Sequence, residues 1–262
     1  MRILGSLMGV LMLWSGLAQA KVKTEVVQYK EGEVVLEGTL SYDDAISKPA
    51  PGVVVIHDWM GAGAFSQKKA EDLAALGYVA FAADIYGKGV RPKDGNEAGA
   101  LAGKFKGDRT KLRARARAAL EALVKSGKVD PKRIGVMGFC FGGTTSLELA
   151  RSGAEVAAVV SFHGGLDSPT PADGKNIRGR VLVLHGADDP FVKVEDLNAF
   201  KAELRSAKVD WQFVEYSGAV HAFTNPAAGN DNSKGAAYNA LADRRSWLMM
   251  KSFFEEVLGP RS

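Results

Sequence analysis

The sequence is poor in cysteine, because Cys140 is the single one among its 262 residues. One cysteine excludes an internal disulfide, and it excludes every metal site that needs several cysteine ligands. The H-E-x-x-H pattern of zinc hydrolases is also absent, so we expect no metal ion. The G-x-G-x-x-G pattern of dinucleotide-binding proteins is missing as well.

Long apolar runs are lacking beyond Leu17, since none reaches the eighteen residues of a membrane span. The chain begins with Arg2, an apolar run over residues 3–17 and the small-residue pattern Ala18-Gln19-Ala20. This order is typical of a cleavable signal peptide over residues 1–20. It predicts a secreted or periplasmic protein that starts at Lys21 and has no stable membrane anchor; the alternative is an uncleaved N-terminal anchor. An unpaired cysteine in an exported protein points to a reactive thiol.

Charge of one sign is not in large excess, with a formal net charge of +4 and a pI near 9.0. The composition is 46% hydrophobic and 24% charged, which excludes disordered, collagenous and coiled-coil classes. One basic stretch contains Lys111, Arg113, Arg115 and Arg117. Side chains two residues apart scatter around a helix axis, so we expect a solvated helix with snorkelling arginines rather than a nucleic-acid interface.

The chain alternates strand and helix patterns. Apolar and β-branched runs predict strands over residues 33–42, 53–56, 78–83, 134–137, 156–162, 181–184 and 211–216. Helices are predicted over residues 66–76, 110–126, 140–152, 194–207 and 236–258, and residues 96–105 are ambiguous. This order predicts an α/β fold with a mostly parallel central sheet and helices on both faces, as a single domain over residues 21–262.

The segment Gly138-Phe139-Cys140-Phe141-Gly142-Gly143 follows a predicted strand and opens a predicted helix. It fits the Gly-x-nucleophile-x-Gly elbow, with cysteine as the nucleophile. The glycines leave room for a tight turn, and the helix N-terminus favours a thiolate and a developing oxyanion. The alternative is a buried structural cysteine beside a glycine-rich turn.

A carboxylate and a histidine follow the nucleophile in the expected chain order. Asp188 and Asp189 lie in a loop after the strand at residues 181–184, and His221 lies in a loop after the strand at residues 211–216. We favour Asp189 over Asp188 as the acid, because Gly186, Asp189 and Val192 stand in register and Pro190 fixes the backbone that follows. Three more histidines, His57, His163 and His185, each end a predicted strand, where a structural role is more common.

Together these residues resemble the dienelactone hydrolase family, whose members have the α/β-hydrolase fold. The matching blocks are V-I-H-D-W-M-G at residues 55–61, A-D-I-Y-G at 83–87, the elbow at 138–143, G-A-D-D-P-F-V at 186–192 and H-A-F at 221–223. The resemblance implies a Cys140–His221–Asp189 triad that cleaves small esters or lactones through an acyl-thiol intermediate. It also implies an oxyanion hole from the backbone N–H groups of Phe141 and Trp59, and no cofactor. We expect a monomer whose partner is a small molecule, not a nucleic acid.

The sequence departs from the family's best-known members at three positions around the substrate. Asp58 stands where they carry a glutamate that contacts the thiol, and Lys88 and Asn225 stand where they carry two arginines that bind a substrate carboxylate. Because lysine and asparagine do not replace a bidentate guanidinium, we expect a neutral or differently shaped ester as substrate. The alternatives are a thioesterase and a catalytically weak hydrolase fold that binds a ligand or senses oxidants through Cys140.

Overall fold

The computed structural model describes residues 21–260, in which eight strands form one sheet in the order β1-β2-β4-β3-β5-β6-β7-β8. The strands are β1 (Val22–Glu31), β2 (Val34–Asp43), β3 (Ala50–Ile56), β4 (Val79–Ala83), β5 (Val129–Phe139), β6 (Ala158–Phe162), β7 (Arg180–Gly186) and β8 (Trp211–Tyr216). All pairs from β4 to β8 are parallel, while β1 and β2 are added antiparallel at one edge. The predicted signal peptide, residues 1–20, lies outside the described residues.

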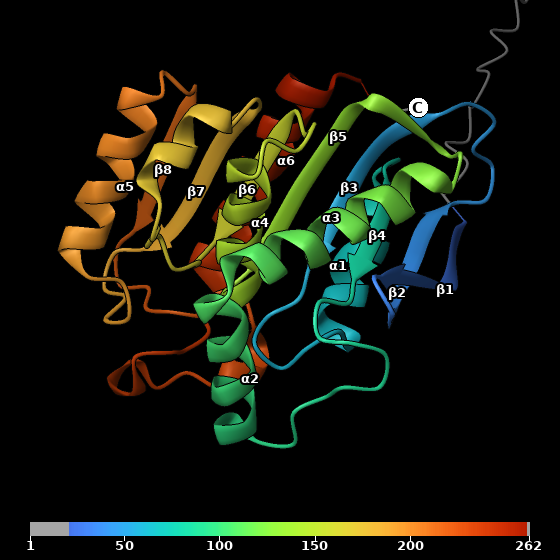
Figure 1. The fold of residues 1–262 in the computed structure, drawn as a ribbon. Coiled ribbons are helices and arrows are strands. Elements are labelled where there is room, and N and C mark those ends of the chain that lie inside the picture. The colour runs from blue at the N-terminus through green and yellow to red at the C-terminus, as the bar shows by residue number, and fades with distance from the viewer. Residues whose placement is uncertain (1–20, 261–262) are drawn as a thin grey trace, which may run out of the picture.

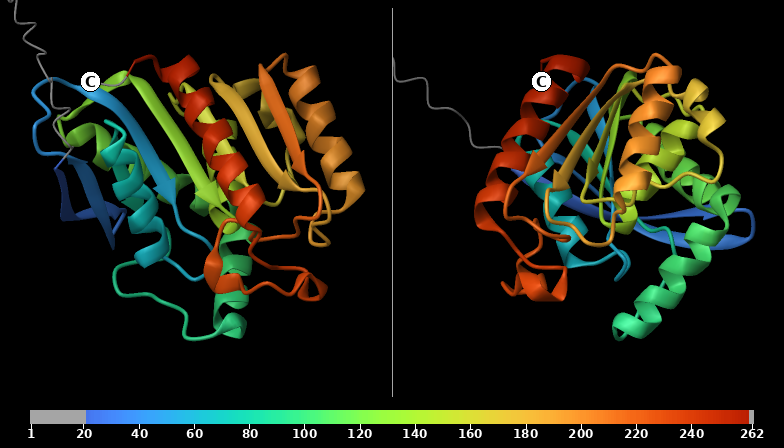
Figure 2. Two further views of the ribbon diagram at one scale, coloured as in Figure 1. Left: turned by 180° about the vertical axis from the view of Figure 1, so that it is seen from behind. Right: turned by 90° about the vertical axis from the view of Figure 1, so that its left-hand side faces the viewer.

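Helices cover both faces of the sheet (Figure 1 and Figure 2). On one face lie α1 (Ala64–Ala75) and α6 (Ala240–Leu258), and on the other lie α3 (Arg109–Lys125), α4 (Phe141–Arg151) and α5 (Val194–Ser206). Each face encloses its own apolar core, and the central strands β3, β4 and β6 are buried along their whole length. Burial on both faces explains why these strands are continuous apolar runs.

The carboxyl ends of the parallel strands meet at one edge of the sheet, which is the lower edge in Figure 1. Helix α2 (Gly95–Gly107) projects beyond this edge, and the segment between β8 and α6 runs beside it. Asp94 caps α2 by accepting hydrogen bonds from the N–H groups of Asn96 and Glu97. Ligand sites of open α/β sheets form at this edge, so α2 and the segment after β8 frame the region where a site is expected.

The structure differs from the prediction near both ends of the described chain, and β5 begins at Val129 rather than at residue 134. Strand β1 was not predicted, although it pairs with β2 along its whole length. The last helix begins at Ala240 rather than at residue 236, because Asn239 caps it through the N–H groups of Leu241 and Ala242. Residues 237–239 are not helical, and Ala236 forms an isolated parallel bridge with His221.

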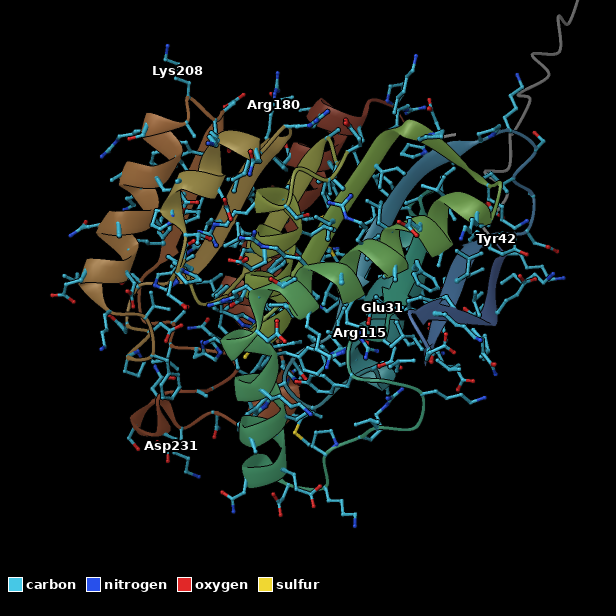
Figure 3. The ribbon with its side chains drawn as sticks, in the orientation of Figure 1. Glu31, Tyr42, Arg115, Arg180, Lys208 and Asp231 are labelled. Carbon is cyan, nitrogen blue, oxygen red and sulfur yellow. The ribbon has the colours of Figure 1, made fainter. Side chains whose placement is uncertain are left out.

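The prediction of a solvated basic helix at residues 111–117 is wrong for its arginines. Arg115 is buried, and its Nε lies 3.0 Å from Glu31 Oε2 of β1; both residues are labelled in Figure 3. Arg113 lies 2.7 Å from carboxylate oxygens of both Glu148 and Asp173. These arginines therefore attach α3 to the edge of the sheet and to α4, through the partly exposed carboxylates of Glu31 and Asp173 and the buried carboxylate of Glu148.

Within residues 21–260, no helix combines the length and the apolar character that crossing a bilayer requires.

Candidate active site

The three residues of the predicted triad stand at the carboxyl ends of three parallel strands. Cys140 follows β5, Asp189 lies in the loop after β7, and His221 lies in the loop after β8. These strand ends lie at the same edge of the sheet, so residues separated by long stretches of sequence come together.

The turn at Cys140 is tight. Its φ of 54° and ψ of −115° lie in a region that non-glycine residues rarely adopt. A Cβ on Gly138 would lie 2.2 Å from the carbonyl oxygen of Gly142, and a Cβ on Gly142 would lie 2.3 Å from that of Ile56. Glycine is therefore required on both sides of the cysteine, as the elbow pattern predicts.

Helix α4 begins directly after the cysteine, at Phe141. The first N–H groups of a helix have no acceptor within it, so they are available to a negative charge. The ring of Phe141 is buried against the rings of His57 and Tyr86, at centroid distances of 5.7 and 5.2 Å. This packing supports the N-terminal turn beside the sulfur of Cys140, which is itself partly exposed.

Asp189, and not its neighbour Asp188, is the carboxylate that faces His221. Asp189 Oδ2 lies 2.8 Å from His221 Nδ1, and its other oxygen accepts a hydrogen bond from the N–H of Phe191 at 2.9 Å. Asp188 instead accepts a hydrogen bond from the N–H of Gly218 at 3.1 Å. The Asp189 carboxylate is buried, which strengthens its interaction with the imidazole.

The environment of His221 favours the imidazolium form. Burial on its own lowers the pKa of this histidine, but the charge of Cys140 and hydrogen bonds to Asp189 and Cys140 outweigh it. Together they raise the pKa of His221 to about 10. A histidine that is protonated at neutral pH between a sulfur and a carboxylate is suited to stabilise a thiolate and to donate a proton afterwards.

The loop after β3 carries Asp58 and Trp59, and His57 holds it in place. His57 Nδ1 lies 2.6 Å from the carbonyl oxygen of Asp58, while its Nε2 accepts the N–H of Ile85 at 3.1 Å. Because Nε2 accepts, the proton lies on Nδ1 and is donated to the Asp58 carbonyl. The hydroxyl of Tyr86 donates to the carbonyl of Trp59 at 3.0 Å, so the Trp59 backbone is fixed from two sides.

Two of the three predicted substrate-binding residues lie together. Asn225 Nδ2 donates to Asp58 Oδ2 at 3.3 Å, and Asn225 Oδ1 accepts the N–H of Ala227 at 3.0 Å. Lys88 is placed elsewhere, since its ammonium lies 3.0 Å from Glu37 Oε2 on β2. Asp58 and Asn225 therefore form a hydrogen-bonded polar pair, while the charge of Lys88 is balanced by Glu37.

The sequence did not single out two side chains of this region, Tyr86 and Phe191. Burial raises the pKa of the Tyr86 hydroxyl, and the charges of Cys140 and Asp58 raise it further, which places this hydroxyl near both groups. Phe191 is 61% exposed, and its ring centroid lies 5.4 Å from that of His221. Both residues stand in blocks that the resemblance had marked, but the blocks alone did not show which side chains face the cysteine.

No group of three or more metal-ligating side chains with metal-binding geometry occurs among the described residues.

Comparison with known proteins identifies the family. The dienelactone hydrolase family matches residues 37–258 of the chain. The chain belongs to the dienelactone hydrolase family. The predicted α/β-hydrolase fold is thereby confirmed, since solved structures of this family superpose on the eight-stranded sheet and its helices.

Three relatives show how closely the family is matched. The solved structure named m3DLH is 44% identical, with a TM-score of 0.87 over 90% of this chain and 98% of its own. A dienelactone hydrolase-like promiscuous phosphotriesterase from metagenomic libraries is 41% identical, with a TM-score of 0.85 over the same shares of the two chains. A Bradyrhizobium protein provisionally named 2-oxo-3-(5-oxofuran-2-ylidene)propanoate lactonase is 30% identical over 75% of this chain and 80% of its own.

Proposed function

We propose that this member of the dienelactone hydrolase family is an exported hydrolase that cleaves small carboxylic esters or lactones through an acyl-thiol intermediate. The observation that carries the proposal is the arrangement of Cys140 at the elbow, His221 with its pKa raised by the neighbouring Cys140, and Asp189 at 2.8 Å from His221 Nδ1. The lactonase name of the Bradyrhizobium relative supports the same substrate class.

In the proposed first half-reaction, the thiolate of Cys140 attacks the carbonyl carbon of the substrate. The carbonyl oxygen becomes an oxyanion beside the N-terminus of α4, where the backbone N–H groups of Phe141 and Trp59 stabilise it. The carbon–oxygen bond to the leaving group then breaks, and the proton on His221 Nε2 passes to the leaving alkoxide. The acyl group stays on the sulfur, and in a lactone the alcohol remains part of the same molecule.

In the second half-reaction, neutral His221 takes a proton from water, and the hydroxide attacks the acyl-thiol carbon. The carbon–sulfur bond breaks, a carboxylic acid leaves, and Cys140 returns to the thiolate with the proton on His221. Asp189 keeps Nδ1 protonated throughout, so that Nε2 faces the sulfur.

The direct test compares wild-type protein with the Cys140→Ala variant on an aryl ester and a simple lactone. Loss of the nucleophile should lower kcat by several orders of magnitude, on the scale of about 10⁶ for a triad nucleophile. Mass spectrometry of wild-type protein quenched during turnover should show the mass of one acyl group on the peptide that contains Cys140. Hydrolysis by Cys140→Ala at the wild-type rate would exclude the mechanism, and a wild-type protein without turnover on any ester or thioester would favour a ligand-binding or thiol-sensing role.

A second candidate activity is the hydrolysis of neutral phosphotriesters. It is favoured by the 41% identity to a relative that is named as a promiscuous phosphotriesterase. The pairing of Asn225 with Asp58, in place of a guanidinium, also suits a substrate without negative charge. Turnover of an aryl dialkyl phosphate by wild type, and its loss in Cys140→Ala, would establish this activity alongside ester hydrolysis.

Export remains part of the proposal and rests on the pattern of residues 1–20. N-terminal sequencing of protein recovered outside the cytoplasm should begin at Lys21. A membrane-bound product that retains Met1 would replace the cleaved signal by an uncleaved anchor.

A further inference from the structure

His163 connects the two catalytic loops although it belongs to neither. It follows directly after β6, is 1% exposed, and uses both ring nitrogens. The backbone N–H of Cys140 donates both to the carbonyl of Phe162 at 3.0 Å and to His163 Nδ1 at 3.1 Å, and His163 Nε2 lies 2.8 Å from the hydroxyl oxygen of Thr224. Thr224 stands three residues after His221, so one imidazole spans the distance from the nucleophile's backbone to the loop of the catalytic histidine.

These two contacts fix the protonation of the ring. Since the N–H of Cys140 points at Nδ1, this nitrogen has to be unprotonated, and the single proton lies on Nε2 and is donated to Thr224. In an imidazolium, the N–H at Nδ1 would point directly at the N–H of Cys140, and the two donors would repel each other. Burial, and next to it the charge of His221, whose ring contacts that of His163, hold the pKa of His163 well below its usual value.

The backbone leaves the ring little freedom to move. His163 has a φ of 39°, and its N–H is bound to the carbonyl of Leu184 at 2.8 Å. The next residue is Gly164, at which a Cβ would lie 2.4 Å from Ser161 Oγ. Cys140 and Ala222, the neighbour of His221, also have positive φ values, of 54° and 57°. Three strained turns thus meet at this imidazole, and strained turns persist only where the surroundings hold them.

The ring also touches the catalytic imidazole. Its centroid lies 5.2 Å from that of His221 and 5.0 Å from that of Phe223, with interplanar angles of 65° and 78°. His163 therefore limits the position of the His221 loop in two ways, by the hydrogen bond to Thr224 and by edge-to-face contact.

We propose that His163 is a positioning residue, a neutral bridge that sets the distance and orientation between the Cys140 sulfur and the His221 ring. The inference rests on the proposed function, because it assigns His163 a role in the same thiol chemistry. A small misplacement of reacting groups lowers the rate by up to about a hundredfold. Loss of the bridge should therefore lower the rate if catalysis requires the sulfur and the imidazole to be aligned.

The test compares His163→Phe, which keeps a ring but removes both hydrogen bonds, with His163→Asn, whose side-chain oxygen still accepts the N–H of Cys140. We expect His163→Phe to lower kcat by about tenfold to a hundredfold with KM little changed, and His163→Asn to recover part of the loss. Equal loss in both variants, or a change in KM alone, would overturn the proposal.

Alkylation of Cys140 by iodoacetamide gives a readout that needs no substrate. In His163→Phe the pH profile of alkylation should move to higher pH, because an imidazole out of line with the sulfur stabilises the thiolate less. A purely structural role would lower the melting temperature and leave this profile unchanged, which would refute positioning. If iodoacetamide alkylates Cys140 of the wild type as expected but the wild type hydrolyses no ester, the proposed function is wrong. The comparison of alkylation profiles still tests the bridge in that case.

A second pair of variants applies if His163→Phe does not fold. Thr224→Val keeps the shape of the side chain and removes the acceptor of the Nε2 proton, whereas Thr224→Ser keeps the hydroxyl. We expect Thr224→Val to lower kcat and to move the alkylation profile, and Thr224→Ser to resemble wild type. Identical behaviour of these two variants would contradict a bridge through Thr224.

Discussion

At the scale of single residues, the two adjacent carboxylates Asp188 and Asp189 differ in their partners. Only Asp189 bonds to His221, and Asp188 bonds to the backbone of Gly218. Asp189→Asn should lower kcat/KM by roughly 10³–10⁴-fold, because an amide at this place favours the wrong tautomer of the histidine. Asp188→Asn is the matched control and should have a much smaller effect. Ester hydrolysis by both variants measures this, and a larger loss in Asp188→Asn would reverse the assignment.

Asn225 is expected to limit the use of anionic substrates. Its amide bonds to Asp58, so this place offers a neutral donor next to a carboxylate. Asn225→Arg should improve kcat/KM for an ester that carries a free carboxylate, relative to a matched neutral ester, by about tenfold to a hundredfold. This range corresponds to the ~1.5–3 kcal/mol of a hydrogen bond to a charged group.

The control for this prediction is Asn225→Gln, which lengthens the side chain without adding charge and should leave the preference for the neutral ester in place. If Asn225→Arg folds and stays active but shows no gain for the anionic ester, residue 225 does not face the substrate.

At the scale of elements, the elbow between β5 and α4 leaves no space for a side chain at its glycine, whereas the exposed helix α2 does. A Cβ at Gly142 would lie 2.3 Å from the carbonyl of Ile56, whereas nothing lies within 4 Å of a Cβ at Gly103 of α2. Gly142→Ala should therefore lose activity and about 1–3 kcal/mol of stability, because the backbone of β3 has to give way. Gly103→Ala should gain about 0.5–1 kcal/mol through better helix propensity and keep its activity.

Thermal melts and ester hydrolysis of both variants check the pair. Wild-type stability and activity in Gly142→Ala would show that the turn is looser than its geometry indicates.

The elements that the sequence predicted correctly are those with strong local signals. The buried strands are continuous β-branched runs, and the elbow carries its glycines at fixed spacing. Strand β1 was missed because it is an edge strand with charges on both faces; Val26, for example, is 67% exposed. Its strand conformation comes from pairing with β2, a tertiary effect that outweighs its weak periodicity.

Site residues follow the same division between local and distant signals. The order of Cys140, Asp189 and His221 is visible in the sequence, since each follows a strand. The contacts of His163 are not, because its partners Cys140 and Thr224 lie 23 and 61 residues away. The burial of the Arg115 side chain was not predicted for the same reason, since its partner Glu31 belongs to the strand that was not predicted.

At the scale of the whole molecule, the raised pKa of His221 couples folding to pH. A group whose pKa is higher in the folded protein stabilises it fully below the unfolded value and loses this contribution as the pH rises through the folded value. For His221 these values are 6.5 and about 10. The difference in melting temperature between wild type and His221→Gln should therefore be most favourable to wild type below pH 6.5 and should decline toward pH 10.

Melting temperatures of the two proteins across this range measure the decline. A difference that stays constant from pH 6.5 to pH 10 would mean that His221 keeps its ordinary pKa in the folded protein.

The strand order has a consequence for the time at which reactivity first appears. Cys140 follows β5, but its partners stand after β7 and β8, the last two strands to emerge during synthesis. Parallel pairing of such distant segments is a late event in folding. A nascent or half-folded chain would hold the thiol at the start of α4 without the base His221 and without the carboxylate of Asp189. Onset of hydrolysis would then mark the completion of folding, so a refolding experiment followed by ester cleavage would time the docking of β8 onto the sheet.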